Sequence, residues 1–187
     1  MTSKTFLFLI LAGLILAAFP GAVPVVASSG NQAAFVRPDT STGGSWKGTY
    51  GSDGYAIAYD SQSIPSYATF AVQNQSNYTW ASGTSDSRAL QTGSGTGRIA
   101  STWYSGTTFN FDLNLTDGNS HQIALYAVDW DNWGGGRAER VQIVDANTNA
   151  VLDTQNISGF FNGIYLVWNI SRRSESLSRL RFGEKKN

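Results

Sequence analysis

The stretch "TFNFDLNLTDGNSHQIALYAVDW", residues 108–130, decides the fold class. In residues 108–115, four apolar side chains alternate with three polar ones, which predicts a strand with one face in a core and the other in water. Residues 116–119, TDGN, have the composition of a hairpin turn. Residues 121–130 are apolar on both faces, so we expect a central strand that pairs back.

The same period-two pattern recurs outward from this stretch and indicates further strands at 66–72, 98–104, 139–146, 150–157 and 163–170. The turn residues NTN at 147–149 predict a second hairpin between 139–146 and 150–157. Residues 28–43 have the composition of a flexible lead-in. Many short strands without helical periodicity predict an all-β, antiparallel two-sheet β-sandwich or jelly roll over residues 44–170.

The N-terminus has the layout of a secretory signal. Lys4 precedes an apolar run from Phe6 to Phe19, and small residues follow up to Ala27. This run is shorter than the roughly 20 apolar residues of a membrane span. We therefore expect residues 1–27 to be a signal peptide cleaved after Ala27, a secreted, extracellular protein, and no membrane span in the mature chain. An uncleaved N-terminal anchor is the alternative.

Composition narrows the class further. The chain has 187 residues, no cysteine and a formal net charge of zero. The absence of cysteine excludes a disulfide scaffold and thiolate metal sites. The balanced charge gives no attraction to nucleic acid, so no nucleic-acid partner is expected. These features are typical of one monomeric, extracellular β-domain.

The end of the chain, residues 171–187, contains six lysines or arginines. A jelly roll usually needs a closing strand at this point to cover a sheet edge. Residues 177–183 could supply a poor one through Leu180 and Phe182, followed by a solvated basic tail. An altered chain end and a tail that binds an anionic surface are the alternatives.

The sequence argues against catalysis. His121 is the only histidine and lies at a turn, where a surface position is expected. It stands without a nucleophile motif, and one histidine cannot form an H-E-x-x-H site. Between residues 30 and 170 the only glutamate is Glu139. Asp129 and Asp131 share one face of a strand, but nearby arginines would hold them ionised. We therefore expect no enzyme.

The segment VDWDNWGGGRAERV, residues 128–141, is the densest in charge and aromatics. We expect a structural salt-bridge cluster of Asp129, Asp131, Arg137 and Arg140 at a strand end. One alternative is a calcium site at Asp129 and Asp131, because Ca²⁺ takes carboxylate and carbonyl oxygens. The other is direct contact of these acids with a ligand. No other cofactor is expected.

The aromatic residues indicate a ligand surface. An exposed ring can stack on the C–H face of a sugar while neighbouring polar groups bind its hydroxyls. Trp133, which follows Asn132 and precedes three glycines, is the best candidate for exposure. Trp103 and Trp168 lie in apolar strands and are expected in the core. The predicted ligand-binding residues are Trp133, Trp46, Tyr50, Asp53, Asn132 and Arg137, with Tyr78 as a further aromatic candidate.

Several segments together resemble a known module. They are WKGTYGSDGYAIA, TWYSGTTFNFDLNLTDGNSHQIALYAVDWD, GGGRAERVQIVDANTNAVLDTQNIS and GIYLVWNI. They look like a module of secreted bacterial proteins that is similar to galactose-binding-like jelly rolls, the architecture of many carbohydrate-binding modules. The likeness spans about residues 44–170, and the tail after Asn169 departs from it. It implies that the acid-rich strand end and the following hairpin are scaffold.

We therefore expect a non-catalytic carbohydrate-binding module whose partner is a polysaccharide or glycan. The alternatives are an Ig-like structural or adhesion module with a protein partner, and a jelly-roll hydrolase or lyase. Sugar binding predicts two or more exposed aromatic rings on one surface beside polar side chains. A structural module predicts that those rings are buried. An enzyme predicts a cleft that holds two acids, or His121 beside Tyr and Arg, without neutralising partners.

Overall fold

The structure, a computed structural model, describes residues 5–9, 13–17, 30–171 and 178–186. Its regular elements in these ranges are strands and one 3-10 turn, η1 (Trp133–Gly135). The strands are β1 (Thr5–Leu9), β2 (Gly13–Ala17), β3 (Gln32–Asp39), β4 (Tyr55–Ala56), β5 (Gln62–Ser63), β6 (Ala68–Gln73), β7 (Ser76–Ala81), β8 (Leu90–Gln91), β9 (Arg98–Tyr104), β10 (Thr108–Leu115), β11 (His121–Ala127), β12 (Ala138–Asp145), β13 (Val151–Ser158), β14 (Ile164–Ser171) and β15 (Ser178–Lys186). The strands pair antiparallel, so the predicted all-β, antiparallel class is confirmed.

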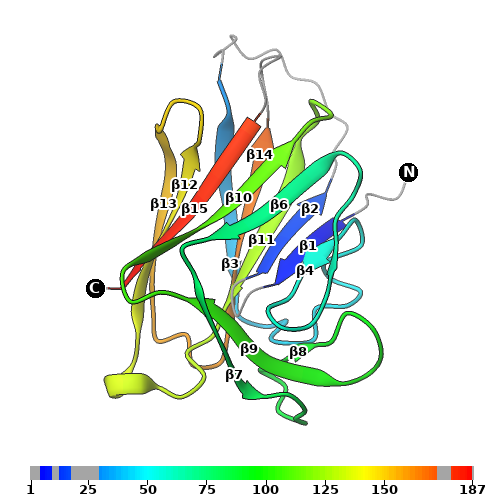
Figure 1. Ribbon diagram of the computed structural model, residues 1–187, viewed down its shortest axis with the longest axis vertical. Helices are drawn as coiled ribbons and strands as arrows, with labels where there is room; N and C mark the ends of the chain where they lie inside the picture. Colours follow the sequence, from blue (N-terminus) through cyan, green and yellow to red (C-terminus); the bar gives the residue numbers. More distant parts are fainter. Residues whose placement is uncertain (1–4, 10–12, 18–29, 172–177, 187) are drawn as a thin grey trace.

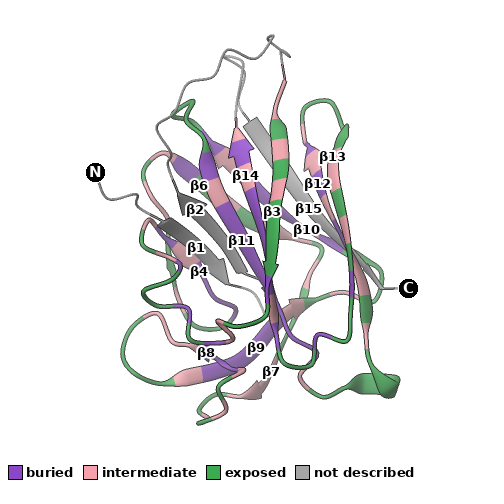
Figure 2. Ribbon diagram, turned by 180° about the vertical axis from the view of Figure 1, so that it is seen from behind, coloured by how far each residue is buried: buried purple, intermediate pink, exposed green. Residues whose placement is uncertain are grey.

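Two sheets lie face to face and give the fold its layers (Figure 1). The larger sheet has the order β13-β12-β15-β10-β6, and the smaller has the order β11-β14-β3. The view from behind places β3, β14 and β11 in front of the larger sheet (Figure 2). A further small sheet, β7-β9-β8, lies at one end of both layers. The arrangement is β-sandwich-like.

The main hydrophobic cluster fills the space between the two sheets. The alternating apolar residues of β10 all belong to it, which confirms the period-two prediction for 108–115. Trp168 on β14 is fully buried in the same cluster. Burial of each large apolar side chain stabilises the fold by about 1.5–3 kcal/mol. The opposite face of β10 is less exposed to solvent than predicted. Asp112 on this face is buried and accepts a hydrogen bond from Gln73 Nε2 at 3.3 Å.

A second hydrophobic cluster covers the outer face of β11 and β14. Ala124, Tyr126 and Val128 contribute from the β11 side, and Tyr165 and Val167 contribute from β14. The segments that pack on them are the loop before β4 and the strands β8 and β9. β11 is therefore buried on both faces, as its apolar sequence predicts, because it lies between two clusters. The expectation of a central strand is wrong, since β11 is the end strand in the order β11-β14-β3.

The predicted hairpin at residues 116–119 is wrong. β10 pairs with β15 and β6, whereas β11 pairs with β14, so the turn carries the chain from one layer to the other. The Thr116 N–H donates to the Tyr67 carbonyl at 2.9 Å, and Asp117 holds the turn through the Asn119 N–H at 3.1 Å. Turn residues specify a chain reversal, but both strands bury apolar faces more completely by facing each other across the core than by pairing edge to edge. The second predicted hairpin, β12 with β13, is confirmed.

The predicted flexible lead-in contains a strand. β3 pairs with β14, and the Phe35 ring packs edge-on against Trp168 at 5.5 Å between centroids. β3 is the last strand in its sheet, where Pro38, which lacks an N–H, is tolerated. The mixed sequence around Pro38 hides the period-two pattern, so composition alone misses this strand.

The basic end of the chain contributes a central strand rather than a poor edge strand. β15 lies between β10 and β12 and pairs with both. In backbone register, Leu180 lies opposite Leu113, and Phe182 lies opposite Phe111 and Ile143. The solvated basic tail, the altered chain end and the tail that binds an anionic surface stay predictions, because no side chain after Ser171 is described.

The N-terminal segment is described only in part. β1 and β2 form an antiparallel pair, and β2 lies beside β11. Ala27 and the predicted cleavage point lie outside the described residues, so removal of residues 1–27 stays a prediction. In the described ranges, no helix has the length and hydropathy needed to cross a membrane.

Asp39, the last residue of β3, stabilises the following turn through side-chain hydrogen bonds. Its carboxylate accepts hydrogen bonds from the Ser41 N–H at 2.8 Å, the Thr42 hydroxyl at 2.6 Å and the Tyr50 hydroxyl. Burial raises the pKa of Asp39, but hydrogen bonds from Thr42, Tyr50 and Ser41 outweigh this effect and hold the pKa well below its ordinary value. Because the unfolded-state pKa is about 3.9, this stabilisation is fully present above that pH and is lost as the pH falls through the folded-state pKa.

We therefore expect acid to unfold the protein partly through Asp39. The midpoint temperature of thermal unfolding should decrease as the pH is lowered from about 5 to about 2.5. In Asp39→Asn it should already be lower at pH 7 and should change less over the same range. Circular dichroism melting curves at several pH values measure both trends. Parallel curves for the two proteins would show that Asp39 does not carry this dependence.

Candidate functional site

An ion-paired cluster forms between the end of β11 and the start of β12. Asp129 is 2% exposed, and its Oδ2 accepts a hydrogen bond from the backbone N–H of Arg137 at 2.8 Å. Nη1 of Arg137 forms ion pairs with Oδ1 of Asp129 and Oδ1 of Asp131. The guanidinium therefore closes the loop of residues 129–137 at its base. Three of the four residues of the predicted salt-bridge cluster are joined in this way.

Arg140 does not join this cluster. In the described part of the chain, no ion pair links Arg140 to Asp129 or Asp131, and its buried Nε has no hydrogen-bond partner. Successive residues of a strand point to opposite faces. Because Glu139 lines the cavity described below, Arg140 points away from it.

The loop closed by Arg137 presents Trp133 to solvent. Trp133 is 64% exposed and begins the short turn η1. Asn132 has a φ of 50° and Gly134 a φ of 66°, so the backbone on both sides of the ring is left-handed. Gly134 adopts this conformation without strain, and Asn tolerates it better than most residues. The local sequence thus lifts an aromatic ring clear of the protein surface, as predicted.

The opposite wall comes from β7 and β9. Tyr78 on β7 lies in register with Thr102 on β9, and both line the same cavity. The register shifts between Thr79 and Ala81, so Trp80 is the extra residue of a β-bulge. Bulges re-aim side chains and are frequent beside functional sites. Trp80 Nε1 donates to Oδ2 of Asp131 at 3.3 Å, which connects this wall to the Arg137 cluster.

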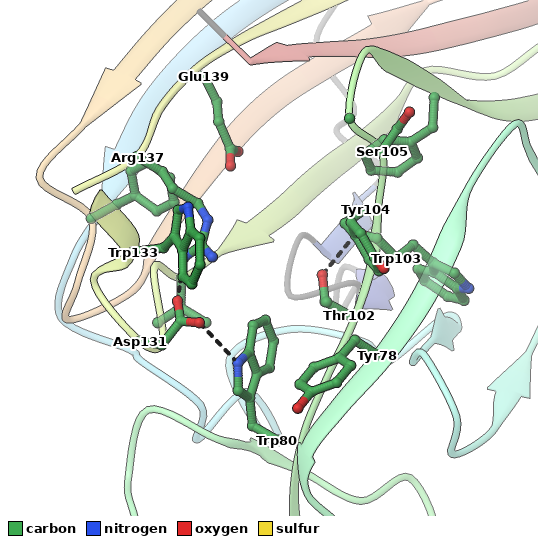
Figure 3. A pocket seen from close by; sticks show the side chains of 14 residues that line it. Tyr78, Trp80, Thr102, Trp103, Tyr104, Ser105, Asp131, Trp133, Arg137 and Glu139 are labelled. Atoms are coloured by element: carbon green, nitrogen blue, oxygen red, sulfur yellow. Dashed lines mark hydrogen bonds and ion pairs between the residues drawn. The ribbon is translucent and has the colours of Figure 1, made fainter. Parts of the chain in front are cut away.

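Between these walls lies an aromatic groove of about 490 Å³ (Figure 3). Its exposed rings are Tyr78, Tyr104 and Trp133. Figure 3 shows Trp133, Arg137 and Asp131 on one side, and Tyr104 and Tyr78 on the other. The full lining is Tyr78, Trp80, Thr102, Trp103, Tyr104, Ser105, Gly106, Phe109, Val128, Asp131, Trp133, Arg137, Glu139 and Phe160.

The charged side chains Asp131 and Arg137 of the groove form an ion pair with each other. The hydrogen bond from Arg137 is the main cause that lowers the pKa of the Asp131 carboxyl, and Trp80 adds to it against the effect of burial. Asp131 is therefore ionised at neutral pH and poorly suited to donate a proton. The same guanidinium occupies Oδ1 of both Asp129 and Asp131, so a calcium ion at this place would have to displace it.

Arg88 holds together the two loops that carry the groove. Its guanidinium lies 4.4 Å from the Trp130 ring centroid and 4.3 Å from that of Phe161. Nη1 donates to the carbonyls of Trp130 and Phe161, each at 3.3 Å, and Asp86 binds Nε and Nη2. A rigid, planar donor between two rings suits arginine and not lysine. Trp130 precedes Asp131 and Phe161 follows Phe160, so this contact sets the loops that line the groove.

The groove thus combines stacking surfaces, hydrogen-bond donors and carboxylate acceptors on one face. No protein-family model, curated protein or solved structure matches the chain. The chemistry of the groove is therefore read from its own residues. Exposed aromatic rings beside a small number of oriented polar groups are typical of sites for amphipathic ligands such as sugars.

Two predicted stacking residues are in the core instead. Trp46 is 2% exposed, and its Nε1 donates to the Gln91 carbonyl at 2.8 Å. Tyr50 is 4% exposed, and its ring packs on Tyr165 at 4.6 Å between centroids. Both cover the outer face of β11 and β14, which would otherwise be apolar and exposed to water. Neither ring is available to stack on a ligand.

Of the three polar residues predicted to contact a ligand, only Arg137 lines the groove. Asp53 lies outside its lining and accepts a hydrogen bond from the Tyr67 hydroxyl at 2.7 Å. Asn132 is exposed and shapes the Trp133 loop without lining the groove. Asp53 therefore holds Tyr67, and Asn132 acts through the backbone.

His121 is buried, although its turn position suggests the surface. Its Nε2 lies 2.9 Å from Oδ1 of Asp117, and its ring stacks on Tyr67 at 4.7 Å. The turn at residues 116–119 crosses from one sheet to the other, and this crossing places the His121 ring against Tyr67. His121 lies outside the lining of the groove.

Sequence reasoning missed Trp80, Tyr104 and Glu139 as groove residues. Trp80 and Tyr104 come from paired strands, and both reach the Trp133 loop only through the fold. One local signal was present: Tyr78 and Trp80 alternate in a short polar strand, where an aromatic pair has no apolar partner in the sequence nearby. Trp103 is partly buried and packs against Phe111, as a core position predicts, but it also lines the groove.

Proposed function

We propose that the protein is a secreted bacterial, non-catalytic carbohydrate-binding module of the galactose-binding-like jelly-roll type, which binds a polysaccharide or glycan in the aromatic groove as a monomer. One observation carries this proposal. Three exposed rings, Trp133, Tyr78 and Tyr104, surround a single cavity. Exposed apolar rings that gather on one surface often mark a ligand-binding groove. The segment 1–27 would serve export and be removed.

The polar residues suit sugar hydroxyls. Asp131 and Glu139 offer carboxylate acceptors, and Arg137 offers guanidinium donors, on the same wall as Trp133. A pyranose presents C–H groups on its faces and hydroxyls on its rim. Rings therefore stack on its faces while the charged side chains bind the rim.

The state of the carboxylates favours binding over hydrolysis. Glycoside hydrolysis needs two carboxyl groups, one of which is protonated and acts as the acid. Of the two acids in the groove, Asp131 is ion-paired with Arg137 and has a lowered pKa. An Ig-like structural module would bury its aromatic rings, and Trp133 is exposed.

A pull-down on insoluble polysaccharides tests the proposal. The purified protein is mixed with cellulose, xylan, mannan, chitin and β-1,3-glucan, and the supernatant is assayed for protein and for released sugar. We expect retention on at least one polymer without sugar release. Trp133→Ala should weaken binding by about 30-fold, as expected for the loss of an anchoring aromatic side chain.

The matched control is Tyr59→Asn. Tyr59 is 64% exposed, like Trp133, but lies outside the groove lining. Its φ of 57° is left-handed, which asparagine adopts readily. Equal loss of binding in both variants would contradict the groove assignment. Sugar release would establish an enzyme, and a folded protein that binds no polymer would favour the structural module.

A further inference from the structure

A continuous chain of contacts links the two walls of the groove at one end. Arg137 pairs with Asp131, and Asp131 accepts the hydrogen bond of Trp80 at 3.3 Å. The Trp80 ring in turn meets Tyr78 edge-on, with centroids 5.3 Å apart. Figure 3 shows Trp80 and Asp131 at one end of the groove, where this bridge joins its two walls. A polymer cannot continue past that end without breaking the bridge.

The opposite end is built differently. Ser105 lies there on one wall and Glu139 on the other. Gly106, which also lines the groove, follows Ser105 in the chain. The Ser105 hydroxyl is engaged within its own turn, where it accepts the Thr107 N–H at 3.2 Å. A Cβ added to Gly106 would meet no atom within 4 Å, so the backbone of this turn is not packed against another segment on that side. The groove is thus bridged at the Trp80–Asp131 end, whereas the described hydrogen bonds of Ser105 at the other end stay within its own turn.

We infer that the groove binds the end of a glycan chain and not its interior. The inference rests on the proposed function and adds the part of the polymer that is recognised. A terminal sugar has one ring face for Trp133 or Tyr78 and free hydroxyls for the bridged end. In the described part of the chain, Arg137 pairs through Nη1 alone, so its other N–H groups can donate to those hydroxyls. The rest of the glycan leaves past Gly106.

Binding capacity against chain length tests this inference. Soluble xylan, mannan and mixed-linkage glucan are each separated into a short and a tenfold longer fraction, and are titrated into the protein at equal mass. A chain-end site requires about tenfold more mass of the long fraction to saturate the protein, because that fraction has tenfold fewer ends. An interior site requires equal masses, and that result would overturn the inference while leaving the proposed function intact.

Two variants test whether the hydrogen bond between Trp80 and Asp131 closes this end of the groove. Trp80→Phe keeps an aromatic ring but removes the N–H that binds Asp131, so the mass ratio between long and short fractions should fall from about ten toward one. Tyr59→Phe, the matched control, removes a hydroxyl from an exposed ring outside the groove lining and should keep the ratio of the unmodified protein. An unchanged ratio in Trp80→Phe would overturn the closure by this bridge. Failure of every fraction to bind, together with no retention on any polymer in the pull-down, would instead remove the proposed function itself.

Discussion

Asp129→Ala is expected to destabilise the protein by about 3 kcal/mol, because it removes one partner of a buried ion pair. Asp129 receives both the backbone N–H and the guanidinium of Arg137. Without that carboxylate, the base of the loop that carries Trp133 is no longer fixed. We expect glycan binding to be lost as well, even at temperatures where the variant is folded.

Asp131→Ala is the matched comparison. Asp131 pairs with the same guanidinium, but its side chain is 35% exposed, against 2% for Asp129. Exposed ion pairs contribute only about 0–1 kcal/mol, so this variant should lose little stability. Urea unfolding at pH 7 measures both changes. Similar losses in the two variants would mean that burial of Asp129 does not set the strength of the cluster.

Gly44→Ala is expected to destabilise the protein by more than about 4 kcal/mol, an unusually large effect for a single methyl group. A Cβ at Gly44 would lie 1.9 Å from the carbonyl oxygen of Ala89 and 2.5 Å from its carbonyl carbon. Both atoms belong to the backbone, so no side-chain rotation relieves the overlap. The two segments are also held together by the Gly44 N–H to Ser87 carbonyl bond at 2.9 Å.

Gly83→Ala supplies the control for this effect. A Cβ at Gly83 would meet no atom within 4 Å, and its φ is not left-handed. That variant should stay within about 1 kcal/mol of the unmodified protein, or gain slightly from a less flexible unfolded chain. Chemical denaturation of the three proteins measures the difference. A free energy of unfolding for Gly44→Ala within about 1 kcal/mol of that for Gly83→Ala would refute the close approach of these segments.

Local patterns predict the strands far better than their partners. The expected strands at 98–104 and 108–115 coincide with β9 and β10, because alternation records which residues face a core. The partner of β10 is not encoded locally. Residues 116–119 specify a reversal, and only the packing of two whole layers decides whether it joins neighbours or crosses the core.

The candidate site shows the same division. Exposure of Trp133 follows from its neighbours, since Asn132 and Gly134 impose a left-handed backbone. Trp46 and Tyr50 lie in a glycine-rich segment that also suggests exposure, yet β11 and β14 need a cover on their outer face. Trp80 could not be foreseen beside Asp131, because the contact depends on a bulge and on two distant segments.

β15 has a consequence for the order in which the protein folds. In the larger sheet, β15 lies between β10 and β12 and joins them. It follows every other described strand along the chain. Contacts over such long sequence separations form slowly, because loop-closure entropy is lost before they form. Until residues 178–186 dock, β10 and β12 each carry an open edge that can recruit another molecule. Self-association during folding is therefore governed by how soon this late segment is inserted, and chaperone demand should concentrate on that interval.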